Sequence, residues 1–136
     1  MLATNIAETS ITIPGVRYVI DSGLVKEKIF SPLTSIETLQ VLPISQSSSL
    51  QRAGRAGREA PGECYRLYTR EAFQALETMP VAEIHRTELS GAVLQLYAMH
   101  LDPFTFDWID PPNQALLQEA VLHLAELGAI QSPKDG

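Results

Sequence analysis

The segment QRAGRAGRE, residues 51–59, places three arginines and two glycines within nine residues. On a helix of about 100° per residue, Gln51, Arg55 and Arg58 would share a stripe roughly 60° wide. Arg52 would point about 100° away from Gln51. Two arginines at i and i+3 repel each other unless an anion lies between them, and guanidinium groups bind phosphate oxygens in bidentate geometry. The pattern therefore predicts an anion site; the alternative is a solvated basic helix face.

The charge of the chain is unevenly distributed. The formal net charge is −6 over 136 residues. Residues 1–70 nevertheless hold eight of the ten basic side chains and six of the sixteen acidic ones, whereas residues 71–136 hold two and ten. This asymmetry predicts two functional regions, of which the first is suited to meeting an anion.

Composition narrows the class of protein. An apolar content of 45% with 19% charged residues is typical of a globular protein. No run of eighteen apolar residues is present and the N-terminus lacks a secretory signal, so neither a membrane span nor secretion is predicted. The single Cys64 cannot form an internal disulfide. No metal site is predicted, because the three histidines lack metal-ligand spacing with this cysteine.

The elements that would position the arginines form an α/β pattern. Short β-rich runs are predicted at 16–23 and 63–68, and a β-hairpin at Val25–Leu42. The serines before Gln51 can cap the start of a helix. Strands mixed with short helices indicate a largely parallel sheet, with the hairpin as an excursion.

The second half has a different character. The sequence predicts a short helix from Arg70 that is broken at Met79–Pro80, then an amphipathic helix from Thr87. A second helix is predicted over 116–127, with Gly128 as its C-terminal stop, and a turn over 131–136. Between these helices, core packing is favoured over base stacking for three aromatic side chains: Phe104, Phe106 and Trp108.

Two motifs together resemble a known family. TNIAETSITIPG, residues 4–15, followed by QRAGRAGRE resembles motifs V and VI of the DEAH-box RNA helicases of superfamily 2. The hairpin region, CYRLYTREAF and EIHRTELSGAVLQLYAM resemble the segments between and after these motifs. The resemblance implies a partial RecA-like domain of the P-loop NTPase type over 1–78. It also implies the start of a mostly helical winged-helix region over 79–136, carried by FDWIDPPNQALLQEAVLHLAELGAI.

The resemblance implies a role for several residues of the first half. In this family ATP lies between two RecA-like domains. Arg55 and Arg58 would act as arginine fingers on the β- and γ-phosphates, and Gln51 would contact the γ-phosphate or position the attacking water. Thr12 would lie near the nucleotide ribose. Arg52, which points elsewhere, is expected to be structural.

The resemblance also implies RNA contacts. Thr4 matches the threonine that contacts the RNA backbone, and the hairpin would lie near the RNA path. Lys26 and Lys28 would assist there or would simply be solvated. Pro14 departs from the family pattern, because many members have an acidic residue there that contacts the ribose. The ribose contact is therefore expected to be weaker or to be supplied elsewhere. The resemblance implies ATP as the nucleotide, with other NTPs as alternatives.

What the sequence lacks defines the expected activity. The chain contains neither a G-x-x-x-x-G-K-[ST] loop nor a D-E-x-H magnesium motif. We therefore interpret it as part of an ATP-dependent RNA helicase that couples hydrolysis to translocation and unwinding. Mg²⁺ would be held by a first RecA-like domain, and this chain alone is expected to be inactive. The alternative is a truncated, non-catalytic module that binds RNA or protein.

The expected partners follow from that interpretation. They are RNA, the first RecA-like domain, the remaining C-terminal domains and a protein activator, with no membrane partner. The expected location is the nucleus or nucleolus, with the cytoplasm as the alternative.

Overall fold

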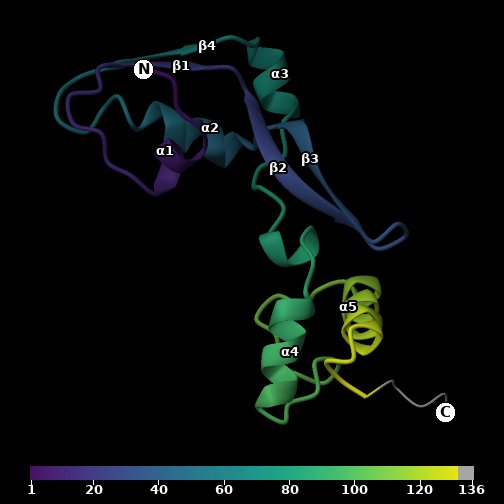
Figure 1. Cartoon of the computed structure of the whole chain (residues 1–136). Helices are drawn as coiled ribbons and strands as arrows, with labels where there is room; N and C mark the ends of the chain where they lie inside the picture. The colour runs from purple at the N-terminus through teal and green to yellow at the C-terminus, as the bar shows by residue number, and fades with distance from the viewer. Residues whose placement is uncertain (132–136) are drawn as a thin grey trace. The chain divides into compact units, whose positions relative to one another are not determined.

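The computed structural model describes residues 1–131, which fall into two units (Figure 1). The first unit comprises residues 1–27 and 40–80, and the second comprises 28–39 and the chain from 81 onward. In chain order the helices and strands are α1 Ile6–Thr9, β1 Tyr18–Asp21, β2 Leu24–Ser31, β3 Ile36–Pro43, α2 Gln46–Ala53, β4 Glu63–Arg66, α3 Arg70–Ala75, a 3-10 helix Glu83–His85, α4 Ser90–Ala98 and α5 Gln114–Glu126.

The first unit is built on a parallel pair of strands. β1 pairs with β4 in parallel, with Tyr18 opposite Glu63 and Asp21 opposite Arg66. This pairing confirms the predicted parallel sheet, although each strand is shorter than expected. α2 contacts both β1 and α1, so one face of the strand pair is covered by the helix that begins the arginine segment.

The predicted hairpin is confirmed. β2 pairs with β3, and the two strands are joined by residues 32–35. At its base, the Ile44 amide donates to the Gly23 carbonyl at 3.0 Å. Gly23 has a φ of +75°, and a Cβ there would lie 2.7 Å from the ring of Tyr68. Both the backbone conformation and the close approach therefore require glycine at this position.

α2 is capped as predicted but ends earlier than predicted. The Ser45 hydroxyl accepts a hydrogen bond from the Ser48 amide at 3.1 Å. The helix ends at Ala53, and residues 54–60 form turns and bends. The expectation of a continuous helix through Arg58 was therefore wrong. Two glycines in four residues weaken the helix by roughly 0.8–1.0 kcal/mol each, which favours turns over further helical residues.

α3 also ends before its predicted limit. Thr69 caps its start by accepting from the Ala72 amide at 3.1 Å. Leu76 then adopts extended backbone angles, so the helix stops before Met79–Pro80.

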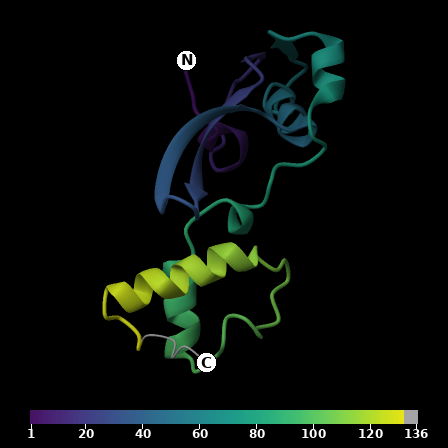
Figure 2. The ribbon, with the colours of Figure 1, turned by 90° about the vertical axis from the view of Figure 1, so that its right-hand side faces the viewer.

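The second unit has a core formed by two helices. α4 and α5 lie side by side (Figures 1 and 2). Trp108 packs against this core and donates from Nε1 to the Pro103 carbonyl at 2.9 Å, so its predicted packing role is confirmed. Phe104 and Phe106 remain 47% and 37% exposed, so packing does not bury them. The buried core residues are Leu89, Val93, Leu116, Leu117, Ala120, Val121 and Leu124.

The ends of these helices follow local chemistry. α4 begins at Ser90 instead of Thr87, and the Ser90 amide donates to the Glu88 carboxylate at 2.6 Å. Asn113 caps α5 by accepting from the Ala115 amide at 2.9 Å. Gly128, with a φ of +69°, follows the end of α5 as predicted. Most of the turn predicted over 131–136 lies outside the described residues.

Within residues 1–131, no helix is both long enough and apolar enough to cross a membrane. No strand occurs between residue 81 and residue 131.

Candidate anion-binding site

The guanidinium of Arg55 is the least satisfied polar group near the arginine segment. Arg55 follows α2 in the turn over residues 54–57. Its Nε and Nη1 atoms are buried, and within the described chain neither has a hydrogen-bond partner. Buried donors without acceptors are unfavourable, and more so when the group is charged. Guanidinium N–H groups make strong, charge-assisted hydrogen bonds to anionic oxygens, so these free donors are suited to an anionic ligand.

Arg58 lies on the following bend and contacts the chain near Thr12. Its Nη1 donates to the Thr12 Oγ1 at 2.6 Å, in an exposed position. Next to it, the Gly15 amide donates to the Glu59 carboxylate at 3.0 Å. The structure therefore brings together two residues, Thr12 and Arg58, that the sequence placed in one candidate nucleotide site.

Arg52 has a different environment from Arg55. Its Nε donates to the Glu8 carboxylate at 2.9 Å, and its Nη1 donates to Asp21 at 2.8 Å and to the Leu24 carbonyl at 3.1 Å. The three charged side chains are only 17%, 10% and 0% exposed for Arg52, Glu8 and Asp21. Arg52 thus joins α2 to α1 and β1, as its predicted structural role requires.

Asp21 is the centre of a buried polar cluster that the sequence did not reveal. It accepts from the Gly23 amide at 3.0 Å and from the Tyr68 hydroxyl at 2.8 Å. Ser49 on α2 shares a 2.7 Å hydrogen bond with the same Tyr68 hydroxyl. Burial alone would raise the pKa of Asp21, but hydrogen bonds from Gly23, Tyr68 and Arg52 outweigh burial and hold the pKa below its ordinary value. Asp21 therefore stays ionised and anchors α2 to the sheet.

The same cluster also disfavours ionisation of the Tyr68 hydroxyl. Burial, and then the neighbouring carboxylate of Asp21, raise the pKa of its hydroxyl. The only sequence signal for this cluster is an acidic residue at the end of an apolar strand, because Asp21 and Tyr68 are 47 residues apart.

The remaining predicted residues are exposed and dispersed. Gln51 lies on the last turn of α2, and Thr4 lies two residues before α1, with its carbonyl accepting from the Ala7 amide at 3.1 Å. Lys26 is exposed on β2. Lys28, in the second unit, pairs with Glu37 at 2.7 Å, and this hydrogen bond raises the pKa of the lysine.

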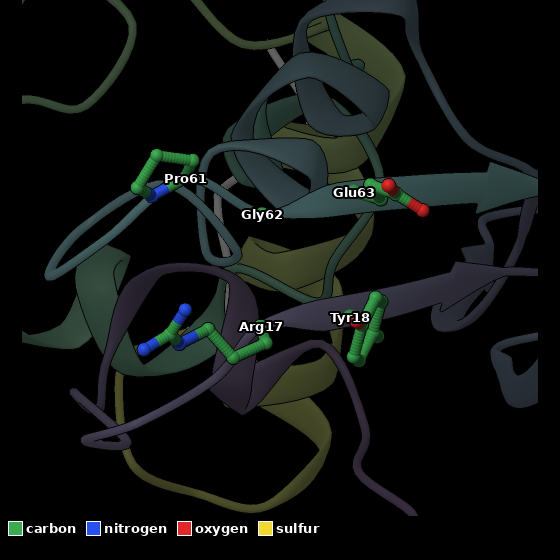
Figure 3. Close-up of a pocket in the computed structure, with 5 residues that line it drawn as sticks. All are labelled: Arg17, Tyr18, Pro61, Gly62 and Glu63. Atoms are coloured by element: carbon green, nitrogen blue, oxygen red, sulfur yellow. The ribbon is translucent and has the colours of Figure 1, made fainter.

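A shallow hollow lies at the beginning of the strand pair, at the opposite end of β1 from Asp21 (Figure 3). Its volume is about 170 Å³. In open α/β sheets, ligands bind beyond the carboxyl ends of strands, so this position does not favour a ligand site. The hollow is lined by Arg17, Tyr18, Pro61, Gly62 and Glu63.

The sequence is similar to helicases throughout most of its length. Residues 1–60 match the helicase conserved C-terminal domain. The probable ATP-dependent RNA helicase DHX34 of Mus musculus is 50% identical over 133 residues, which are 97% of this chain and 12% of that protein. The pre-mRNA-splicing factor ATP-dependent RNA helicase DEAH10 of Arabidopsis thaliana is 50% identical over 131 residues, which are 96% of this chain and 18% of that protein.

Solved structures agree with the sequence relatives. The Escherichia coli DEAH/RHA helicase HrpB superposes with a TM-score of 0.89 at 39% identity, covering 96% of this chain and 17% of that one. The chain thus spans less than a fifth of the length of each of these three proteins.

The fold and the arginine segment therefore define the C-terminal RecA-like α/β part of a helicase. More narrowly, the chain is similar to DEAH-box RNA helicases over nearly its whole length, which confirms the resemblance of its motifs.

Proposed function

We propose that this chain is the part of an ATP-dependent RNA helicase that contacts both nucleotide and RNA. The parent protein would couple nucleotide hydrolysis to movement along RNA and to strand separation. The observation that carries the proposal is the guanidinium of Arg55, whose buried Nε and Nη1 lack a partner within residues 1–131. Guanidinium donors of this kind bind phosphate oxygens, and the related proteins DHX34 and DEAH10 are named ATP-dependent RNA helicases.

Four residues would bind the nucleotide. Arg55 and Arg58 would donate to the β- and γ-phosphates, and Gln51 would contact the γ-phosphate or orient the attacking water. The Thr12 hydroxyl already accepts from Arg58 at 2.6 Å, so it would hold that guanidinium in place beside the ribose. When bound, ATP would supply the phosphoryl group, and Mg²⁺ held by the first RecA-like domain would neutralise part of its charge. Arginine fingers contribute about 10³–10⁵-fold to rate in related NTPases.

RNA would bind through its backbone. Thr4 is exposed at the start of α1 and would contact a phosphate, while Lys26 on the hairpin would add a positive charge. Lys28 is the weaker candidate because Glu37 already pairs with it at 2.7 Å. Binding of this kind depends on salt and only slightly on sequence.

The rest of the chain would connect this region to its neighbours. We assign residues 1–78 to the second RecA-like domain and residues 79–136 to the start of a winged-helix region, which α4 and α5 would begin. The first RecA-like domain, with its phosphate loop and Mg²⁺, and the later C-terminal domains would complete the enzyme, so the chain alone would be inactive. A protein activator and a nuclear or nucleolar location complete the proposal; the name of DEAH10 as a pre-mRNA-splicing factor is consistent with the latter.

One observation favours a second candidate. Tyr18, Ile20 and Tyr65 expose 68%, 72% and 52% of their surfaces on the uncovered face of the strand pair. A non-catalytic module that binds another protein through this face would also explain such exposure.

A strand-separation assay decides between these functions. The chain extended through a first RecA-like domain should separate a short RNA duplex with ATP and not with a non-hydrolysable analogue. The Arg55→Ala variant should fail, whereas Arg17→Ala, which removes an exposed arginine of the same unit, should remain active. Two results would favour the non-catalytic module. One is strand separation that does not depend on ATP, and the other is equal strand separation by the Arg55→Ala and Arg17→Ala variants.

A further inference from the structure

The RNA-side and nucleotide-side segments of the first unit touch at three points. The segment over residues 4–15 carries Thr4, and the segment over 51–59 carries Arg55. The contacts are Glu8 to Arg52 at 2.9 Å, Thr12 to Arg58 at 2.6 Å, and the Gly15 amide to Glu59 at 3.0 Å. Only the first of these is part-buried, because the side chains of Glu8 and Arg52 are 10% and 17% exposed.

Glu8 and Thr4 belong to one turn of backbone. α1 has four residues, Ile6–Thr9, which is too short for a helix to be stable by itself. The Ala7 amide donates to the Thr4 carbonyl at 3.1 Å, and the Glu8 amide donates to the Asn5 carbonyl at 3.0 Å. Consecutive backbone hydrogen bonds therefore link Thr4 to the helix that carries Glu8.

Arg52 is held from its other side by the sheet. Its Nη1 donates to Asp21 at 2.8 Å, and Asp21 is in turn held by Tyr68. Separating a buried ion pair leaves a charge without a partner, which is strongly unfavourable. The ion pair therefore joins α1 to α2, and α2 leads directly into the turn that carries Arg55.

We propose that Glu8 is a positioning residue that couples RNA contact at Thr4 to nucleotide contact at Arg55, through its ion pair with Arg52. This inference rests on the proposed function. Coupling between two binding sites is reciprocal, so RNA would tighten nucleotide binding and nucleotide would tighten RNA binding through the same pair.

The first test is kinetic and uses the parent helicase that contains the first RecA-like domain. Glu8→Gln removes the charge of Glu8 while Arg52 keeps Asp21 and the Leu24 carbonyl. The basal rate of ATP hydrolysis should stay unchanged, and its stimulation by poly(U) RNA should fall about tenfold.

The second test measures binding without catalysis. In the wild-type protein, a non-hydrolysable ATP analogue should tighten binding of a fluorescent oligo(U) RNA. In Glu8→Gln that tightening should decrease about tenfold, because the coupling between the two bound ligands would pass through the same ion pair.

A matched control separates coupling from general loosening. Tyr68→Phe removes a hydroxyl from the opposite side of Asp21 and leaves Glu8 and Arg52 in place. It should lower the melting temperature but retain both RNA stimulation and tightening by the analogue. Full coupling in Glu8→Gln, or equal loss in both variants, would overturn the inference.

Two further outcomes are distinguishable. If Glu8→Gln does not fold, Glu8→Asp keeps the charge but shortens the side chain, and a normal coupling in that variant would overturn the inference. If the wild-type parent hydrolyses no ATP, the proposed function itself fails. Intact ATPase activity with intact coupling in the Glu8 variants would contradict the inference alone.

Discussion

Arg52 and Arg55 are three residues apart, yet their guanidinium groups have opposite environments. Arg52 has three acceptors: two carboxylates and one backbone carbonyl. Arg55 has two buried nitrogens that lack an acceptor within the described residues. One arginine therefore stabilises the fold, and the other retains buried donors suited to an anionic ligand.

Asp21 supplies a prediction at the residue scale. Its folded-state pKa lies below its ordinary value, so its contribution to stability is present at neutral pH and is lost as the pH falls below about 3.9. Asp21→Asn leaves Arg52 with a buried charge that only Glu8 balances, which should destabilise the region by about 3 kcal/mol. Hydrogen exchange of the α2 amides should therefore accelerate about 100-fold near neutral pH.

The control for this variant is Asp107→Asn, at an exposed position. It should leave α2 exchange unchanged. Equal protection of α2 in Asp21→Asn and wild type at neutral pH would show that the cluster does not anchor the helix.

The sequence predicted different roles for Arg52 and Arg55 but did not identify the partners of Arg52. The different direction of Arg52 follows from helical geometry alone, because it precedes the end of α2. Its carboxylate partners are 44 and 31 residues away, at Glu8 and Asp21. Such pairs depend on tertiary packing, which periodicity does not encode.

At the scale of secondary structure, the turns after α2 position Arg55 and Arg58. The sequence predicted a helix through Arg58, but α2 ends at Ala53 and the chain returns to β4 through residues 54–62. The amide of Glu63 then donates to the Arg17 carbonyl at 2.9 Å. The parallel strands and the hairpin were predictable from their local sequence patterns. The end of α2 was not, because the helical periodicity continues past Ala53 whereas Gly54 and Gly57 lower the stability of a helix there.

Gly62 gives a test of this element. A Cβ at Gly62 would lie 2.1 Å from the Ala56 carbonyl oxygen and 2.6 Å from that of Arg17. Both obstacles are backbone, so Gly62→Ala must move the arginine turn away from β1. We expect destabilisation at or above the typical 1–3 kcal/mol of overpacking and a lower melting temperature.

Gly57→Ala is the matched control within the same segment. A Cβ at Gly57 meets nothing within 4 Å, so its melting temperature should stay near that of the wild type. Equal melting temperatures for the Gly62 and Gly57 variants would contradict the close approach of the turn to β1.

At the scale of the molecule, one face of the strand pair is left uncovered by residues 1–131. Ile20, Tyr65 and Leu67 expose 72%, 52% and 69% of their surfaces. An exposed apolar face beside unpaired strand edges promotes association. A partial parallel sheet lacks the layers that normally bury its faces.

The isolated chain should therefore associate in solution. Size-exclusion chromatography with light scattering should show aggregates, and replacing Ile20 and Tyr65 by lysine should increase the monomer fraction. A soluble wild-type monomer that unfolds in a single sharp transition would contradict this prediction.

The rate constant of ATP hydrolysis in the Arg55 variant tests the central claim most directly. In the chain extended through a first RecA-like domain, Arg55→Ala should lower kcat by about 10³-fold or more, while Arg17→Ala leaves kcat unchanged and both variants melt at the wild-type temperature. If Arg55→Ala hydrolyses ATP at the wild-type rate, the unpartnered guanidinium has no catalytic role and the account is wrong.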